Sequence, residues 1–316
     1  MEIKNPFSLY DFLGYFVPGA LCLYILLFLL DISDVKTFEE IANANFSRLD
    51  LSIAFIIIAY ITGHAINYIS SITIEKYSNW MFGYPSAFLL KKGNYSFYKK
   101  WTKKELEKCF EGNISKWNIH LRIKKWMYQC TLKRVQNFSQ LKLHSSSWRF
   151  VLWLFIFPVS TMDWAVGKKM GLRGYYTNPL DNVLILSVQK NLKSLLHNLS
   201  IQGDDEFDFN RILNHYYYEK FDKHILKFDN YVALYGFCRC LSLIFCLTAN
   251  SLVLFLLFSE AVQLTINFVL LFSLTCFLSY LFFMAFMKFY RRYTLECFMC
   301  LVIDKTLEEN KTIIIK

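Results

Sequence analysis

The sequence predicts an all-α membrane protein with four transmembrane helices. Hydrophobic residues make up 55% of the 316 residues, charged residues only 19%, and the mean hydropathy is +0.28. A soluble domain carries about 25% charged residues. The apolar residues are gathered into four blocks without Asp, Glu, Lys or Arg, and no sustained strand alternation lies between them. This composition excludes disordered and collagen-like chains and disfavours an ordinary soluble enzyme.

Each charge-free block is long enough to cross a bilayer, for which a helix needs about 20 apolar residues. The blocks cover residues 12–30, 51–74, 241–258 and 264–287. A fifth apolar run, Val151 to Phe157, is short and is followed by Pro158, which breaks or kinks a helix. We expect this run to be a buried or interfacial segment. A further crossing at 151–166 is the alternative.

The basic residues orient the chain. Residues 75–240 hold 26 Lys and Arg against 13 Asp and Glu, and residues 288–316 hold six against four. The segments 31–50 and 259–263 hold two basic and six acidic residues together. Because basic residues near span ends stay in the cytoplasm, we expect an inner (plasma) membrane protein with both termini cytoplasmic. The expected parts are a transmembrane pair at 1–74, a basic cytoplasmic helical domain at 75–240, a transmembrane pair at 241–287 and a tail at 288–316.

Apolar residues at helical spacing predict two helices in the cytoplasmic domain. One carries Ile185, Val188, Leu192, Leu195 and Leu199 at spacing 3-4-3-4. The other is a stalk helix over 204–235, because no Pro or Gly interrupts this range, and it continues into the third span. Its seam contains Phe221, Ile225, Phe228 and Val232. The seam packs inside the domain or, alternatively, pairs between subunits of a homo-oligomer.

The first part of the domain is basic and rich in aromatic residues. Residues 91–142 hold 14 basic and three acidic residues. The patch is represented by Lys99, Lys100, Trp101, Lys103, Lys104, Lys124, Lys125 and Trp126. Since the domain is tethered to a membrane, we expect contact with anionic lipid headgroups, where each Lys or Arg contributes about 1 kcal/mol. A nucleic acid or nucleotide ligand and a plain solvated face are the alternatives.

Polar side chains also occur inside the predicted spans. Five of them are candidates for a face that points into the helix bundle: His64, Asn67, Ser71, Asn250 and Cys276. Intramembrane polar residues usually face the bundle interior, so we expect His64 and Asn67 to point into the bundle, within reach of the third or fourth span near Asn250. Such a face packs helices through interhelical hydrogen bonds. Alternatively, it lines a conduit or forms a proton relay or a ligand site.

No residue set indicates an enzyme. The sequence has no metalloprotease, nucleophile-elbow, phosphate-loop or dinucleotide-binding motif. The pairs Cys238-x-Cys240 and Cys297-x-x-Cys300 resemble a zinc set. On straight helices, however, they lie roughly 15 Å apart along the membrane normal. We therefore expect no catalytic residues, no metal and no cofactor.

Three strings carry a resemblance to known sequences: YDFLGYFVPG at 10–19, GHAINYISS at 63–71 and GYPS at 83–86. Together they resemble a group of uncharacterised bacterial multi-pass inner-membrane proteins, over about the first 90 residues. Some members of that group occur near anti-phage genes, so the resemblance implies a membrane effector in antiviral defence.

The expected function is therefore a non-enzymatic, oligomeric effector or channel-like protein whose cytoplasmic domain controls the membrane part. A membrane-anchored scaffold or sensor, which recruits a cytosolic or nucleic-acid partner, is one alternative. A lipid-modifying enzyme whose chemistry is not visible in the sequence is another.

Overall fold

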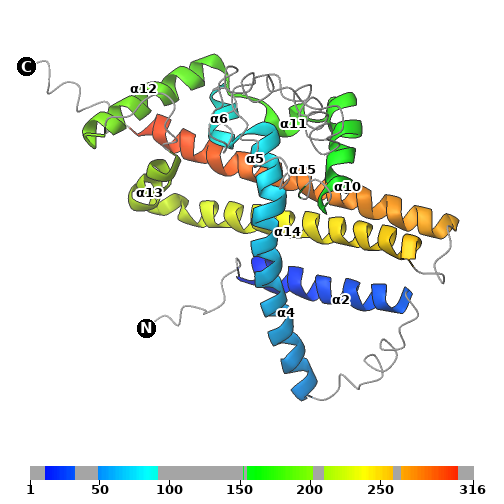
Figure 1. The fold of residues 1–316 in the computed structure, drawn as a ribbon. Helices are drawn as coiled ribbons and strands as arrows, with labels where there is room; N and C mark the ends of the chain where they lie inside the picture. Colours follow the sequence, from blue (N-terminus) through cyan, green and yellow to red (C-terminus); the bar gives the residue numbers. More distant parts are fainter. Residues whose placement is uncertain are drawn as a thin grey trace, which may run out of the picture.

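The computed structural model describes residues 11–32, 49–91, 152, 155–201, 210–258 and 265–304, and every element in these ranges is helical (Figure 1). The helices in the first half are η1 (Phe12–Phe16), α2 (Val17–Ile32), α4 (Leu49–Ser70), η2 (Ser71–Glu75), α5 (Lys76–Phe82) and α6 (Pro85–Leu89). The second half contains α10 (Phe157–Met162), η3 (Asp163–Lys169), α11 (Gly174–Thr177), α12 (Asn182–Asn198), α13 (Asn210–Lys220), α14 (Asp222–Phe258) and α15 (Ile266–Ile303). The predicted all-α class is confirmed for the described part of the chain.

Four helical stretches are long and apolar enough to cross a membrane, as predicted. They are Phe12–Leu29, Ile53–Asn79, His224–Phe258 and Ile266–Ile303. The last three extend beyond the charge-free blocks, since a helix does not end where its first charged residue occurs. Which side of the membrane each end occupies stays a prediction from the charge distribution.

The long helices α14 and α15 form an antiparallel pair and lie side by side along their length (Figure 1). Their register is set by the Ser242 hydroxyl, which donates to the backbone carbonyl of Ser279 at 2.9 Å. Aromatic pairs continue it, with Phe228 and Tyr293 at 6.1 Å between ring centroids. Each helix is about 55 Å long at 1.5 Å per residue, whereas the hydrocarbon core is about 30 Å thick.

Helix α4 runs across α2, and its continuation through η2 into α5 runs across the α14–α15 pair in Figure 1. Two glycines permit its close approach to the first span. A methyl group on Gly19 would lie 1.8 Å from the carbonyl oxygen of Ala59, and one on Gly63 would lie 1.8 Å from that of Tyr15. Small residues at a helix crossing let the two backbones approach, so this crossing depends on both glycines.

Two hydrophobic clusters are stacked along α14 and α15. The first is built around Ile74, Val159, Leu243, Tyr280 and Phe283. The second gathers α6, α12, α13 and the opposite ends of the two long helices around Leu89, Val188, Leu213, Phe228 and Phe298. Residues 288–303 were expected in a tail, but they form the second half of α15 and belong to this second cluster, because their aromatic and thiol side chains need burial.

Helix α12 follows the predicted periodicity. Ile185, Val188, Leu192 and Leu195 are buried in the second cluster, whereas Leu199 lies past the last turn and is 48% exposed. Asn191 on the same face donates from Nδ2 to the backbone carbonyl of Leu301 at 3.0 Å. This bond satisfies a carbonyl that the end of α15 leaves without an intrahelical partner.

The predicted uninterrupted stalk over 204–235 is wrong at Phe221. Helix α13 ends at Lys220 and α14 begins at Asp222, while residues 202–209 lie outside the described part. The break turns α13 back so that Tyr217 packs against Phe228, with ring centroids 6.2 Å apart. The part of the stalk from Asp222 onward is continuous with the third span, as predicted, and Gly236 does not interrupt it.

An ion pair holds α13 to the end of α15. Lys220 Nζ lies 2.6 Å from Oδ2 of the buried Asp304, and Tyr216 donates its hydroxyl to the same carboxylate. Burial acts to lower the pKa of Lys220, but its bonds to Asp304 and Tyr216 outweigh this effect and leave that pKa raised. Lys220 therefore stays charged at neutral pH and the contact persists there.

Candidate functional site

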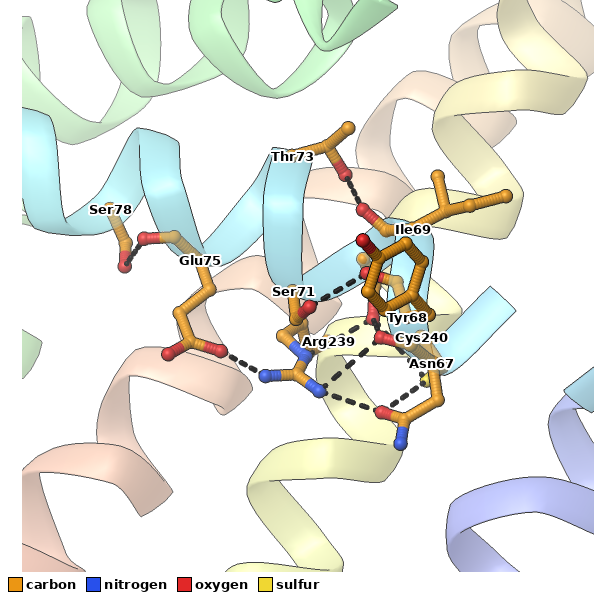
Figure 2. A network of polar contacts seen from close by, with 10 residues as sticks. Asn67, Tyr68, Ile69, Ser71, Thr73, Glu75, Ser78, Arg239 and Cys240 are labelled. Atoms are coloured by element: carbon orange, nitrogen blue, oxygen red, sulfur yellow. Dashed lines mark hydrogen bonds and ion pairs between the residues drawn. The ribbon is translucent and has the colours of Figure 1, made fainter. Parts of the chain in front are cut away.

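A buried polar network joins the second span to the third, at the point where α4 and its continuation cross α14 (Figure 2). At its centre is Arg239, which is only 8% exposed. Its Nε donates to Ser70 Oγ at 3.1 Å, its second terminal nitrogen donates to Asn67 Oδ1 at 2.6 Å, and its first forms an ion pair with Glu75. All three nitrogens of the guanidinium are therefore engaged by the second span.

A local change of helix type brings these partners onto one side. Asn67 and Glu75 are eight residues apart, which in a regular α-helix places them about 80° from each other around the axis. Between them α4 gives way to the π-helical turn η2, Ser71–Glu75. Because a π-helical turn is wider than an α-helical one, it reduces the angle between Asn67 and Glu75 around the axis, and both side chains reach Arg239. Single π-turns inside helices are frequent at functional sites.

Hydroxyl groups around the turn bond to its backbone. Ser70 donates to the carbonyl of Asn67 at 2.8 Å, and Ser71 to that of Tyr68 at 2.7 Å. Thr73 donates to the carbonyl of Ile69 at 2.7 Å (Figure 2). Such local bonds occupy backbone carbonyl groups where the helix is bent or irregular.

The geometry of this network suits a structural contact more than chemistry. A buried guanidinium that donates to a carboxylate and to two neutral acceptors cross-links the two helices. Cys240 Sγ, which is 3.7 Å from Asn67 Oδ1, is a further weak donor. Among the described residues, no group of His, Cys, Asp and Glu is arranged to hold a metal ion. Cys238 and Cys240 lie in the first cluster, whereas Cys297 and Cys300 lie in the second.

The structure does not gather the five predicted intramembrane residues into one face. Asn67 contacts Arg239, and Ser71 bonds within its own helix. Asn250 lies 11 residues beyond Arg239 on α14, about 16 Å away at 1.5 Å per residue. It donates to the carbonyl of Phe155 at 2.7 Å. Asn67 thus reaches the third span, as expected, but it does so at Arg239 and not near Asn250, because α4 meets α14 at the level of Arg239.

His64 also lies apart from Asn250. Its side chain is exposed, stacks on Tyr15 with ring centroids 3.8 Å apart, and meets Tyr60 edge-on at 4.6 Å. Cys276 is buried in α15. The basic and aromatic patch around Lys99 to Trp126 lies outside the described residues.

The predicted stalk seam packs within the chain. Phe228 is 1% exposed in the second cluster, and Phe221 and Val232 pack against that cluster. Ile225 is half-buried. Phe228 is thus not accessible for pairing with a second subunit.

Sequence reasoning missed Arg239 and Glu75, because each was the charged residue that ended a charge-free block. A signal was present for Arg239. It stands three and seven residues before Ser242 and Cys246, which places it on their side of one continuous helix. A charge on the inward side of a span needs a partner, and Glu75 is the first acidic residue after the second block.

A second buried carboxylate belongs to Asp163, the first residue of η3, and its partners come from α11 and the turn before it. Asp163 is fully buried and accepts two bonds from Arg173, from Nε at 3.1 Å and from a terminal nitrogen at 2.5 Å. The hydroxyl of Tyr176 donates to Asp163 at 2.8 Å. Burial and the charge of Asp163 raise the pKa of Tyr176, so its hydroxyl stays protonated and donates.

We expect Tyr176→Phe to lower the free energy of unfolding by about 1.5 to 3 kcal/mol, the usual contribution of a hydrogen bond to a charged group. Tyr175→Phe is the matched control, because the neighbouring side chain is 79% exposed. Unfolding of the purified protein in detergent, followed by circular dichroism, measures both. Equal stability of the two variants would contradict the role given to Tyr176.

Comparison with protein-family models, with curated proteins and with solved structures finds no match for this chain.

Proposed function

We propose that the protein is a non-enzymatic, oligomeric membrane effector of channel-like type, in which helices outside the membrane control the spans. One observation carries this proposal: α14 and α15 run without a break from the second hydrophobic cluster into the first. A displacement of the second cluster is therefore transmitted to the membrane part by two continuous helices.

The lengths of these helices support the proposal. Each is about 55 Å long and exceeds the hydrocarbon thickness by about 25 Å. The excess carries the second cluster, with Phe228 and Phe298 at its centre. A movement at one end of such a rigid helix moves its other end. A rigid connection of this kind can carry coupling between separate sites.

The Arg239 network supports it as well. It lies at the first cluster, to which Cys238 and Cys240 belong, and fastens the second span to α14 through a buried ion pair. A shift of α14 must either carry α4 with it or break this pair. Packed interfaces of this kind switch between discrete arrangements rather than deform continuously.

The placement of the second cluster in the cytoplasm, with both termini, rests on the excess of Lys and Arg in 75–240 and in 288–316. The role in antiviral defence rests on the resemblance of the strings in the first 90 residues. An inner-membrane effector that depolarises the cell agrees with both.

The deciding experiment measures the membrane potential with a potential-sensitive dye in cells that produce the full chain. An effector of channel type depolarises the cells when overproduced or triggered. A scaffold or sensor that recruits a partner leaves the membrane potential unchanged at the same membrane abundance. An unchanged potential, with the protein folded and inserted, overturns the proposal in favour of the scaffold.

Coupling between the clusters predicts an effect of Phe228→Leu on this dye response. The substitution loosens the second cluster and lies outside the charge-free blocks, so we expect the depolarisation per inserted protein to change severalfold. Leu226→Ala on the same helix is the control, because Leu226 is 78% exposed, and we expect it to behave as the unchanged protein. If both variants depolarise alike, α14 does not transmit the state of the second cluster.

A further inference from the structure

One side of α15, drawn in orange and red in Figure 1, carries a row of exposed apolar residues. They follow one another at spacing 4-3-4 and are 40 to 60% exposed: Leu270, Leu274, Phe277 and Leu281. Residues at this spacing lie on one side of a helix. On the opposite side Phe283 is 0% exposed in the first cluster. The four residues therefore form an apolar stripe that the described helices leave open.

The same side of α15 becomes basic where the charge-free block ends at Met287. Lys288 follows Leu281 after seven residues, or two turns, and Arg292 follows one turn later. Both basic side chains are exposed, whereas the neighbouring Arg291 is half-buried. At 1.5 Å per residue the three basic residues lie about 2 to 8 Å beyond the block. This is the depth of the headgroup region, which is roughly 5 to 8 Å thick on each side of the hydrocarbon core.

The loop before α12 holds the side chain of Arg291. The Nε of Arg291 donates to the backbone carbonyl of Asn178 at 3.0 Å. This loop is fixed in turn, because the backbone amide of Leu180 donates to the carbonyl of Leu89 at 2.9 Å. A guanidinium has five N–H donors, and no described residue accepts a hydrogen bond from the two terminal nitrogens of Arg291. The four remaining donors form a planar fork that matches the oxygens of a phosphate.

No carboxylate in the described part of the chain neutralises Lys288, Arg291 or Arg292, because the ion pairs there involve other basic residues. Glu296 is the first acidic residue after the block and lies one turn beyond Arg292, but it pairs with Lys227 at 2.7 Å. Three like charges within about one turn repel one another, and Arg291 is partly withdrawn from water. An anion that contacts all three reduces both costs.

We propose that Lys288, Arg291 and Arg292 bind the phosphate of an anionic phospholipid whose acyl chains lie along the apolar stripe. The stripe favours a lipid over a soluble phosphate. Phe277 and Leu281 lie about 15 and 9 Å before the end of the block, and so within one leaflet of a hydrocarbon core of about 30 Å.

The charge of the site favours a lipid with a net negative charge. A zwitterionic headgroup carries an ammonium group that opposes its own phosphate, whereas basic groups between membrane helices at the headgroup level bind anionic lipids. This lipid site does not depend on the proposed effector function.

Binding of dioleoyl phosphatidylglycerol to the delipidated full-length protein tests the proposal. The protein is kept in micelles of a neutral detergent, and native mass spectrometry counts the lipid molecules that stay bound as the lipid is titrated. Dioleoyl phosphatidylcholine has the same chains without a net charge, and glycerol 3-phosphate has the phosphate without the chains. The variant Arg291→Gln with Arg292→Gln removes two charges from the site. Lys190→Gln with Lys193→Gln removes two charges from exposed positions of α12 and is the matched control.

We expect the unchanged protein to bind phosphatidylglycerol severalfold more tightly than phosphatidylcholine, and glycerol 3-phosphate at the same concentration not to displace it. Each positive charge near an anionic lipid contributes about fivefold in affinity. The double arginine variant is therefore expected to lose about 25-fold in affinity for phosphatidylglycerol and little for phosphatidylcholine. The double lysine variant is expected to keep its affinity for both lipids.

Equal affinity of the two double variants for phosphatidylglycerol overturns the proposal. Equal affinity of the unchanged protein for the two lipids, as when a carboxylate of the chain itself occupies the site, also overturns it. Displacement of the lipid by glycerol 3-phosphate shows a site for a soluble phosphate and likewise overturns it. Lys288→Gln with Arg292→Gln, at two exposed positions, replaces the arginine variant if that variant fails to fold.

Discussion

Removal of the Glu75 carboxylate is expected to destabilise the protein by about 3 to 5 kcal/mol, because it leaves the guanidinium of Arg239 buried without a counter-charge. The Arg239 side chain is 9% exposed, so water cannot replace the carboxylate. Glu75→Leu is the test, with unfolding in detergent as the measurement. The reverse change, Arg239→Met, is expected to cost less, since Glu75 is 27% exposed and can be hydrated.

The double variant Glu75→Leu and Arg239→Met separates the ion pair from the rest of the network. Replacing both charges by apolar groups of similar volume is often neutral, so most of the loss in Glu75→Leu is expected to be recovered. We attribute the loss of unfolding free energy that remains to Asn67 and Ser70, because these side chains no longer accept hydrogen bonds from the guanidinium. Strictly additive losses would show that the two charges do not interact.

The pair Lys227–Glu296 is the matched control. Its two groups are 2.7 Å apart, but their side chains are 47% and 25% exposed. Exposed ion pairs contribute about 0 to 1 kcal/mol, so Glu296→Leu is expected to change the free energy of unfolding little. A loss as large as that of Glu75→Leu would mean that burial does not set the difference.

Gly63→Ala is expected to produce the other large loss of stability. The added methyl group would lie 1.8 Å from the carbonyl oxygen of Tyr15, and a backbone atom cannot rotate aside. Overpacking usually costs 1 to 3 kcal/mol, and this contact places the substitution at the upper end, about 3 kcal/mol. The first two spans must separate to relieve it.

Gly236→Ala is the control for this substitution, because nothing lies within 4 Å of the position of its methyl group. Alanine in a helix interior is favoured over glycine by about 1 kcal/mol, so this variant is expected to gain stability. Gly19→Ala acts at the same crossing as Gly63→Ala. Their combined loss is expected to fall short of the sum, since one separation of the spans relieves both clashes. A full sum would mean that they act at independent contacts.

The sequence alone determined the class of protein and the positions of its spans. Blocks such as 12–30 and 264–287 lack charges over a length that only a membrane or a deep core accepts. The periodicity of α12 likewise identified its buried residues, of which Val188 and Leu195 are examples. These properties depend on residue type and local spacing, and each segment carries them independently of its neighbours.

The tertiary structure alone decided which polar groups meet. Arg239 and Glu75 are 164 residues apart, and their pairing depends on where α4 crosses α14 and on the π-turn between Asn67 and Glu75. His64 instead stacks on Tyr15 of η1, and the Asn250 amide donates to the carbonyl of Phe155, just before α10. The break at Phe221 depends on burying Tyr217 against Phe228. Hydropathy and periodicity place a residue on one side of its own helix, but the packing of glycines and aromatic side chains between helices determines which side of which neighbour it faces.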